Sequence, residues 1–268
     1  MEDIIQYYND YNENDRLSEN HSIERIRTQL IIERYLDNNN KAIIDIGGGT
    51  GVYSFWLANK GFKVDLVDFV PRHIDIAKEK NSKNNNKLNK IEVGDATNLS
   101  YADNTFDYAL LFGPLYHILD RDSRIKAIKE ASRVVKKDGY IFISYISKFA
   151  SLVDGFKYDF VQDQQFITIL DNDLLSGLHI NNTEKPYYFM NTYFHSIDDI
   201  VSEINESGNK ANKILGIEGF SVIIDAPEKK MNDKKYKEYL LKKIEETEEE
   251  KSIIGISSHI MAIIKKST

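Results

Sequence analysis

The stretch Ala42-Ile43-Ile44-Asp45-Ile46-Gly47-Gly48-Gly49-Thr50-Gly51 decides the fold of this chain. Its first half is a short, β-branched apolar run, which is typical of a buried parallel strand. The glycines that follow permit backbone angles forbidden to other residues and let a ligand approach the main chain closely. The turn leads into a helix whose free N–H groups favour anionic groups. The stretch therefore predicts a strand, a ligand-binding turn and a helix.

Helices and strands alternate outward from this unit. An amphipathic helix with Ile23, Ile26 and Ile31 at helical spacing precedes it. Further strand-like segments are Lys63–Asp68, Lys90–Val93, Tyr108–Phe112, Tyr140–Ile146, Lys213–Ile217, Ser221–Ile224 and His259–Ile264. Asp138-Gly139 is expected to form a turn before one of these strands. From residue 41 to 146 the alternation predicts a parallel sheet with helices on both faces.

Asp68 is a second signal for a bound nucleotide. It ends the expected second strand, roughly 20 residues past the glycine turn, where a carboxylate accepts hydrogen bonds from both ribose hydroxyls of an adenosine ligand. The alternative for Asp68 alone is a turn or helix-cap aspartate, because Pro71 begins the next helix nearby. The glycine turn and the acid together favour the ligand-binding interpretation.

The spacing of the glycines excludes two common nucleotide sites. A Walker-type loop ends in Gly-Lys-Ser/Thr, which this turn lacks. The dinucleotide fingerprint G-x-G-x-x-G requires glycine at a position held by Val52 or by Ser54. The turn instead has the pattern acid-x-G-x-G-x-G, with Asp45 as the acid.

Four motifs follow one another along the chain: Asp45–Gly51, Asp68, Gly94-Asp95-Ala96 and Arg133–Gly139. In this order they resemble the motifs of the Rossmann-like (class I) S-adenosylmethionine-dependent methyltransferases of small-molecule type. The resemblance covers roughly residues 22 to 146. It implies an α/β fold with a Rossmann-like, doubly wound, mostly parallel seven-stranded sheet and an antiparallel final strand. The aromatic residues after strand five indicate an aromatic-rich lid insertion there. It also implies S-adenosyl-L-methionine as the cofactor.

The whole chain, residues 1–268, is expected to form a single methyltransferase domain. Its expected parts are an N-terminal helical cap (1–40), the cofactor-binding core (41–146), the lid insertion (147–195) and the C-terminal part of the sheet with its helices (196–268).

The resemblance also implies roles for individual residues. Asp45 would order the turn and the methionine amino group, and Gly47, Gly49 and Gly51 would let the backbone meet the methionine moiety. Asp68 would bind the ribose.

The adenine would be held by the segments after the second and third strands. Phe69 would lie beside the ring, Asp95 would accept from its exocyclic amine, and Ala96 would offer a backbone N–H. A turn aspartate is the alternative for Asp95. Phe112 is a further candidate cofactor residue, and Arg16 or Arg27 could pair with the cofactor's carboxylate.

The fourth strand ends in Leu111-Phe112-Gly113-Pro114-Leu115-Tyr116-His117. Open parallel sheets bind ligands beyond the carboxyl ends of their strands, so this loop should face the methyl group. It lacks the asparagine of the Asn-Pro-Pro-aromatic motif that amino-directed nucleic-acid methyltransferases often show, which argues against adenine-N6 or glutamine methylation. His117 is the candidate general base, with Tyr116 beside it. The alternative is a histidine that only packs at the start of a helix.

The aromatic segment 147–195 offers candidate substrate residues. Tyr188, Tyr193 and His195 are expected to line an apolar pocket near the sulfonium. The alternative is that these side chains form a small core of the insertion itself. The acidic run Glu245–Glu250 is interpreted as a solvated helix face.

Composition limits the remaining functions. The net charge of -7 argues against nucleic acid as the substrate, and the absence of cysteine removes thiolate metal sites, so no metal is expected. Residues 1–4 do not start a signal peptide and no apolar run reaches the length of a membrane span, which predicts a cytoplasmic enzyme without a membrane partner.

The leading interpretation is transfer of a methyl group by in-line displacement to a small-molecule acceptor. The alternatives are an RNA methyltransferase and a non-catalytic S-adenosylmethionine-binding protein. The sequence leaves open the oligomeric state and whether the acceptor atom is oxygen, nitrogen or carbon.

Overall fold

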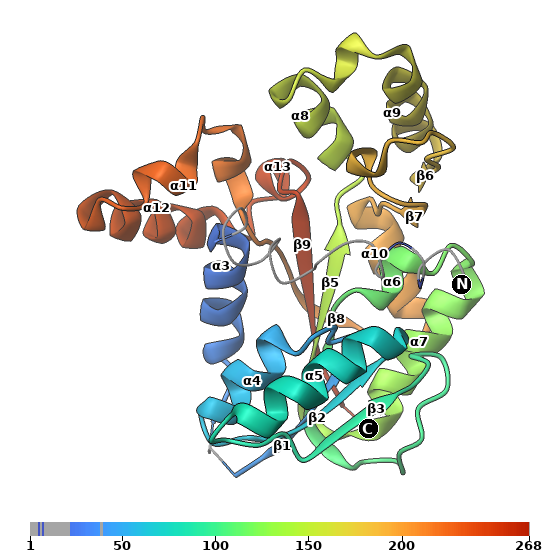
Figure 1. Cartoon of the computed structure of the whole chain (residues 1–268), viewed down its shortest axis with the longest axis vertical. Coiled ribbons are helices and arrows are strands. Elements are labelled where there is room, and N and C mark those ends of the chain that lie inside the picture. The colour runs from blue at the N-terminus through green and yellow to red at the C-terminus, as the bar shows by residue number, and fades with distance from the viewer. Residues whose placement is uncertain (1–4, 6, 8–21, 38–39, 268) are drawn as a thin grey trace.

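A seven-stranded sheet in the order β3-β2-β1-β4-β5-β9-β8 organises the chain. The structure, a computed structural model, describes residues 5, 7, 22–37 and 40–267 (Figure 1). The strands of the sheet are β1 (Ala42–Ile46), β2 (Lys63–Asp68), β3 (Lys90–Val93), β4 (Phe106–Leu111), β5 (Val135–Ile146), β8 (Ala211–Gly216) and β9 (His259–Lys265).

The strand directions confirm the predicted fold class. β1 pairs in parallel with β2 and with β4, β2 with β3, and β4 with β5. The last strand of the chain, β9, is antiparallel to both of its neighbours, β5 and β8. Because the strand order reverses between β1 and β4, a crevice for a ligand opens there beyond the carboxyl ends of the strands.

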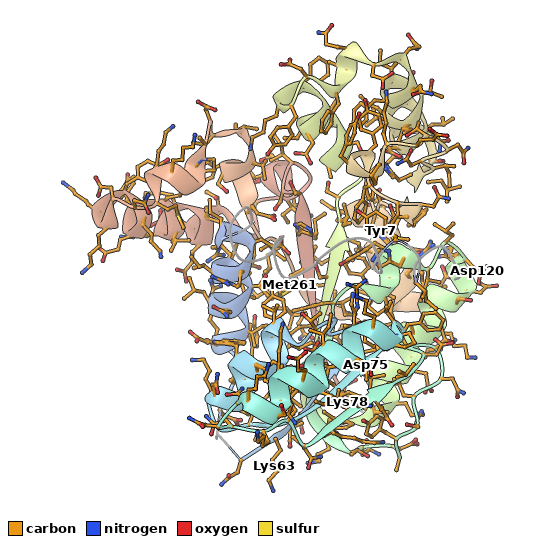
Figure 2. All side chains as sticks on the ribbon, viewed as in Figure 1. Tyr7, Lys63, Asp75, Lys78, Asp120 and Met261 are labelled. Atoms are coloured by element: carbon orange, nitrogen blue, oxygen red, sulfur yellow. The ribbon has the colours of Figure 1, made fainter. Side chains whose placement is uncertain are left out.

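Helices cover both faces of the sheet, as the alternation predicted. One face packs against α3 (Ser22–Glu33), α4 (Val52–Asn59) and α5 (Pro71–Lys83), and the other against α7 (Arg121–Val134) and α10 (Ile197–Glu206). Neighbouring strand residues alternate between the two cores, so that Ile43 faces α4 whereas Ile44 faces α7. Figure 2 shows Met261 of β9 at the centre of the molecule and Lys63 at its edge.

Residues 147–195 form a separate group of elements beyond the carboxyl end of β5 (Figure 1). They comprise α8 (Ala150–Lys157), η2 (Phe160–Gln162), α9 (Gln164–Ser176), β6 (Leu178–His179), η3 (Pro186–Tyr188) and β7 (Thr192–Tyr193), followed by α10. A capping box between Ser196 and Asp199 begins α10. The remaining elements are α6 (Pro114–His117), η4 (Gly219–Ile223), α11 (Pro227–Lys230), α12 (Lys234–Thr247) and α13 (Lys251–Ile254).

Two local predictions were wrong. Asp138-Gly139 is not a turn before the strand, because Asp138 lies within β5. Asp138 has a φ of 65° at the point where the register between β5 and β4 shifts, so the Asp-Gly pair forms a bulge. Ser221–Ile224 is not a strand. Residues 221–223 belong to the 3-10 helix η4 and Ile224 caps it. The Ser221 N–H and hydroxyl both donate to the Glu218 carbonyl instead of to a neighbouring strand.

Among the described residues, no helix combines the length and the apolar character that crossing a membrane requires.

Candidate active site

The glycine turn after β1 lies against the loop that follows β4. Gly47 has a φ of 74°, and a Cβ built on it would lie 2.3 Å from the Cδ of Pro114. Gly49 has a φ of 56°, yet the nearest atom to a Cβ there is 4.0 Å away. The first glycine is therefore required by the close approach of the β4 loop, whereas the space beside the Cα of the second is open, which leaves room for a ligand next to the turn.

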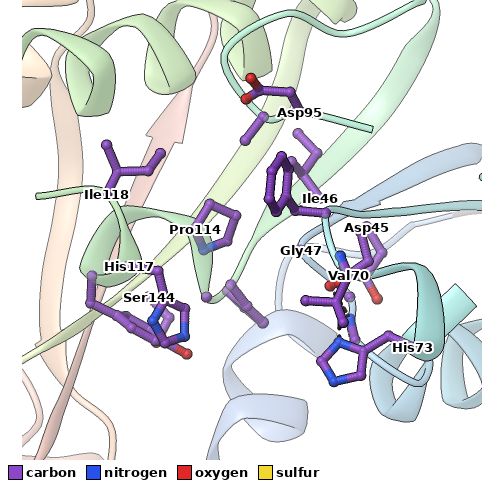
Figure 3. A pocket seen from close by; sticks show the side chains of 18 of the residues that line it. Asp45, Ile46, Gly47, Val70, His73, Asp95, Pro114, His117, Ile118 and Ser144 are labelled. Atoms are coloured by element: carbon purple, nitrogen blue, oxygen red, sulfur yellow. Dashed lines mark hydrogen bonds and ion pairs between the residues drawn. The ribbon is translucent and has the colours of Figure 1, made fainter. Parts of the chain in front are cut away.

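A cavity of about 520 Å³ opens from this turn. Most of the predicted cofactor residues line it: Asp45, Gly47, Gly49, Asp68, Phe69, Asp95, Ala96 and Phe112. Tyr116 and His117 line it as well, whereas Gly51 forms the N-cap of α4 and is not part of the lining. Figure 3 shows Asp45 and His73 on one side of Pro114, and His117 and Ser144 on the other.

Asp45 has a buried oxygen without a partner among the described residues. Its Oδ2 accepts a 2.6 Å hydrogen bond from the Ser54 hydroxyl, but its Oδ1 has no donor. Burial raises the pKa of Asp45 to about 7. A buried carboxyl oxygen left unpaired is costly, so a ligand that brings an N–H donor to this oxygen would be stabilised there.

Asp68 holds the glycine turn to the start of α5. Its carboxylate accepts from the N–H of Gly49 at 2.8 Å and from that of Val70 at 2.9 Å, and Nδ1 of His73 lies 3.1 Å from it. Asp68 therefore does act as a turn and helix-cap aspartate, but this role does not exclude ligand binding. A carboxylate offers about four acceptor sites, and Asp68 still lines the cavity.

Asp95 also has a local role. It accepts a 2.8 Å hydrogen bond from the N–H of Thr97 and forms an isolated bridge with Asn98. Together with Ala96 it lines the part of the cavity next to β3. The turn alternative and a ligand contact are thus compatible here too.

The loop after β4 places two aromatic side chains in the cavity. Gly113, with a φ of 107°, turns the chain into the short helix α6. Tyr116 and His117 are half-buried there, with their ring centroids 4.7 Å apart. The ring of Phe189 lies 6.2 Å from that of His117.

Comparison with known proteins identifies this arrangement. Residues 44–143 match the methyltransferase domain family. Methyltransferase GfsG of Streptomyces halstedii is 29% identical over 44% of this chain and 42% of its own length, so the chain spans less than half of that relative. The ubiquinone/menaquinone biosynthesis C-methyltransferase UbiE of Rickettsia prowazekii is 30% identical over 65% of this chain and 70% of its own length.

The chain belongs to the class I S-adenosylmethionine-dependent methyltransferases. A SAM-dependent methyltransferase from Methanosarcina mazei has the same fold, with a TM-score of 0.60 at 19% identity over 88% of this chain and 97% of that one. The cofactor supplies a methyl group already activated on a sulfonium. The unpaired oxygen of Asp45 and the open space beside Gly49 fit its amino acid part.

The three aromatic residues predicted to line the substrate pocket lie elsewhere in the methyltransferase. Tyr188 packs against Phe166, and its hydroxyl donates to Asp163 at 2.7 Å. The ring of Tyr193 stacks on the guanidinium of Arg124 at 3.8 Å. These side chains stabilise the insertion and its contact with α7, so the alternative of a small internal core describes them better.

His195 is fully buried between the rings of Tyr145 and Tyr193, each 4.7 Å away by centroid. Its Nε2 lies 3.4 Å from a carboxylate oxygen of Glu203. Burial lowers the pKa of His195, although Glu203 opposes this effect. His195 therefore belongs to the interior and does not line the cavity. Two neighbours in the same segment, Met190 and Asn191, do line it.

Of the two arginines proposed for the cofactor's carboxylate, Arg27 does not line the cavity. Arg16 lies outside the described residues. Arg27 is fully buried, forms an ion pair with Glu248 and donates to the Ile217 carbonyl. Arg34 also pairs with Glu248. The expectation that the acidic run 245–250 is wholly solvated was therefore wrong at Glu248, which is buried by these two arginines.

Sequence reasoning missed the residues at the far end of the cavity. They are Glu24 and Thr28 of α3, Ser144 of β5, Met190, Asn191 and His259 of β9. Of these, only Glu24 and Thr28 could have been found from the sequence, because residues four apart lie on the same face of a helix. The others come from distant parts of the chain. His73 was also missed, although it follows Pro71 on the first turn of α5.

Proposed function

We propose that this methyltransferase transfers its methyl group to a small-molecule acceptor inside the cavity. The single observation that supports this proposal is the continuity of the cavity. It runs from the glycine turn past Tyr116 and His117 to Ser144 and His259. Its volume of about 520 Å³ lies within the range of small-ligand sites. The relative UbiE is named for methylation in quinone biosynthesis, which also supports a small acceptor.

We propose that the carboxylates along β1, β2 and β3 hold the cofactor. Asp45 accepts from its ammonium, Asp68 from its ribose hydroxyls and Asp95 from its adenine amine. Phe69 and Ala96 lie beside the adenine, and Phe112 and the glycines at 47, 49 and 51 shape the methionine end. Gly51 contributes through the turn, since it is outside the lining. A contact with Arg16 stays a prediction.

We propose that Tyr116 and His117 align the acceptor with the methyl group. Methyl transfer from a sulfonium is an in-line displacement, so alignment and exclusion of water are the protein's main contributions. Whether His117 also accepts a proton stays a prediction. Tyr188, Tyr193 and His195 support this site from the interior and have no direct role in it.

The division into an N-terminal cap, core, lid and C-terminal part is also a proposal. The separate packing of Phe166, Ile169, Leu170 and Tyr188 within the insertion supports it. A cytoplasmic location is proposed as well, in keeping with a chain that contains no cysteine.

Turnover with a metabolite extract tests the proposal. The purified protein is incubated with S-adenosylmethionine and a small-molecule extract, and S-adenosylhomocysteine is measured. Product that appears only with the extract is expected. Product with RNA but not with the extract would favour the RNA methyltransferase alternative. Cofactor binding without turnover under any of these conditions would favour the binding-protein alternative.

A further inference from the structure

The end of the cavity away from the glycine turn holds a histidine between two carboxylates. Nδ1 of His259 lies 2.6 Å from Oε1 of Glu218 and 3.9 Å from Oε2 of Glu24. All three residues are buried, and Glu24 and His259 line the cavity. The three come from α3, from the segment after β8 and from the start of β9, so only the folded chain brings them together.

Glu218 is fixed by several donors. Its Oε2 accepts from the Ser257 hydroxyl at 2.8 Å and from the His259 N–H at 3.0 Å, and its Oε1 faces the imidazole. Burial alone would raise the pKa of Glu218, but the charge and hydrogen bonds of His259, together with Ser257, lower it to about 2. The carboxylate therefore stays ionised at working pH. It orients the ring and stabilises its protonated form, as in other carboxylate–histidine pairs.

The position of His259 in the sheet places it on the acceptor side of the cavity. His259 pairs with Ile146, the last residue of β5. It therefore lies at the same edge of the sheet as the end of β4, where ligands bind in folds of this kind. Ser144 of β5 lines the cavity between this edge and α6.

The charges around the cavity favour a cationic acceptor. Its described lining contains the carboxylates of Glu24, Asp45, Asp68, Asp95 and Asp120, but no lysine or arginine. Among these described lining residues, an anionic acceptor would face five carboxylates with only histidines as a counter-charge, so transferring it from water would be costly. An ammonium group, in contrast, would find the carboxylate of Glu24 at the acceptor end.

We propose that Glu24 and the Glu218–His259 pair form the acceptor subsite and that the acceptor is a small primary or secondary amine. This inference rests on the proposed function. Glu24 binds the ammonium form. The proton that the amine must lose passes to the imidazole of His259, which Glu218 holds through Nδ1, and then to solvent.

The bonds and charges of the transfer balance. The lone pair of the neutral amine forms the new N–CH₃ bond while the S–CH₃ bond breaks and its electron pair stays on sulfur. The sulfonium becomes a neutral thioether, and the product is the methylated ammonium ion. One proton per turnover leaves through His259. No oxidant or further reactant is needed.

The same three side chains could also be considered as metal ligands, since their ligand atoms lie within 4.8 Å of one another. The hydrogen bonds argue for proton transfer instead. Nδ1 of His259 and both oxygens of Glu218 already bond within the pair and to Ser257, so a metal ion would have to replace these contacts.

Matched probes test the choice of acceptor. Primary amines from ethylamine to 2-phenylethylamine are compared with the alcohols and carboxylates of the same carbon skeletons. Binding to protein loaded with S-adenosylhomocysteine is measured by calorimetry, and methyl transfer is measured with labelled cofactor. The amines are expected to bind at least about tenfold more tightly and to be the only acceptors. Glu24→Gln should remove this preference. Glu33→Gln on the same helix, an exposed residue paired with Lys60, should retain it.

The proton acceptor is tested by turnover against pH. For the best amine, His259→Asn should lower turnover about 10²–10⁴-fold and remove the rise of rate with pH, whereas His117→Asn should keep the shape of the profile. Within the described part of the chain, the carboxylates near His259 are those of Glu24, Glu218 and Asp154 of α8. Burial raises the pKa of Asp154, so the same profile is recorded for Asp154→Asn. That variant should keep the rise of rate with pH.

The outcomes separate this inference from the proposed function. If the protein binds S-adenosylhomocysteine but treats amines no better than alcohols and carboxylates, the amine subsite is refuted and the proposed function stands. A stoichiometric metal ion whose removal stops turnover would refute proton transfer by His259. Failure to bind S-adenosylhomocysteine would refute both. If His259→Asn does not fold, the comparison of Glu24→Gln with Glu33→Gln decides alone.

Discussion

Replacing Asp68 with alanine should weaken cofactor binding and also loosen the glycine turn. The charge-assisted hydrogen bonds that we propose between Asp68 and two ribose hydroxyls would be worth about 1.5–3 kcal/mol each. We expect their loss to cost roughly 3 kcal/mol in total, or ~10²-fold in Kd. The N–H groups of Gly49 and Val70 lose their acceptor as well. Since Val70 is buried, the free energy of unfolding should fall by about 1–3 kcal/mol.

Calorimetry with S-adenosylhomocysteine and denaturant unfolding measure the two effects separately. Asp65→Ala is the matched control, because Asp65 is a buried aspartate of the same strand that accepts from Asn89 and does not line the cavity. It should lower stability but leave the Kd unchanged. Unaltered affinity in Asp68→Ala would show that Asp68 only fastens the turn. Equal loss of affinity in both variants would show that the effect comes from general destabilisation.

Three further substitutions test the structure around the site. Gly47→Ala should abolish cofactor binding and destabilise the fold by more than ~2 kcal/mol in thermal unfolding, since its Cβ would lie 2.3 Å from the β4 loop. The control is Gly208→Ala, where φ is 83° and no atom lies within 4 Å of the added Cβ. It should cost only about 1–2 kcal/mol. The pKa of Asp45 rises from 3.8 to about 7 on folding, so protonation favours the folded state. Without cofactor, the free energy of unfolding should therefore fall as pH rises from 4 to 7. Asp45→Asn should abolish this slope in denaturant titrations. Arg124→Ala, which breaks a buried ion pair, should cost about 3–5 kcal/mol, whereas Arg121→Ala on the surface should cost less than ~1 kcal/mol.

The core of the fold could be predicted from sequence because its signals are local. The bounds of β1, β2 and β3 agree with the prediction, since each is a short segment with β-branched residues that ends at an aspartate or directly before a glycine. The bulge at Asp138 was missed because an Asp-Gly pair looks the same in a turn and in a bulged strand. Only the pairing of β5 with both β4 and β9 distinguishes the two.

The side chains of the insertion could not be assigned from sequence. Tyr188 and His195 are aromatic and polar at once, which suits a pocket and an interior network equally well. The carboxylate that each side chain contacts decides between a pocket and an interior position. Tyr188 contacts Asp163, and His195 contacts Glu203. Nothing in the spacing of these residues indicates which carboxylate each will meet.

The two halves of the cavity also differ in how far the sequence predicts them. The half that we assign to the cofactor is built from consecutive strand-to-helix turns, so each contributing residue follows a recognisable strand end. The opposite half combines Glu24, Ser144, Asn191 and His259, which are separated by long stretches of chain and meet only through the pairing of β9 with β5 and the packing of α3. Sequence motifs can therefore identify the reaction class of such an enzyme, whereas the chemistry of its acceptor is set by tertiary contacts that leave no motif.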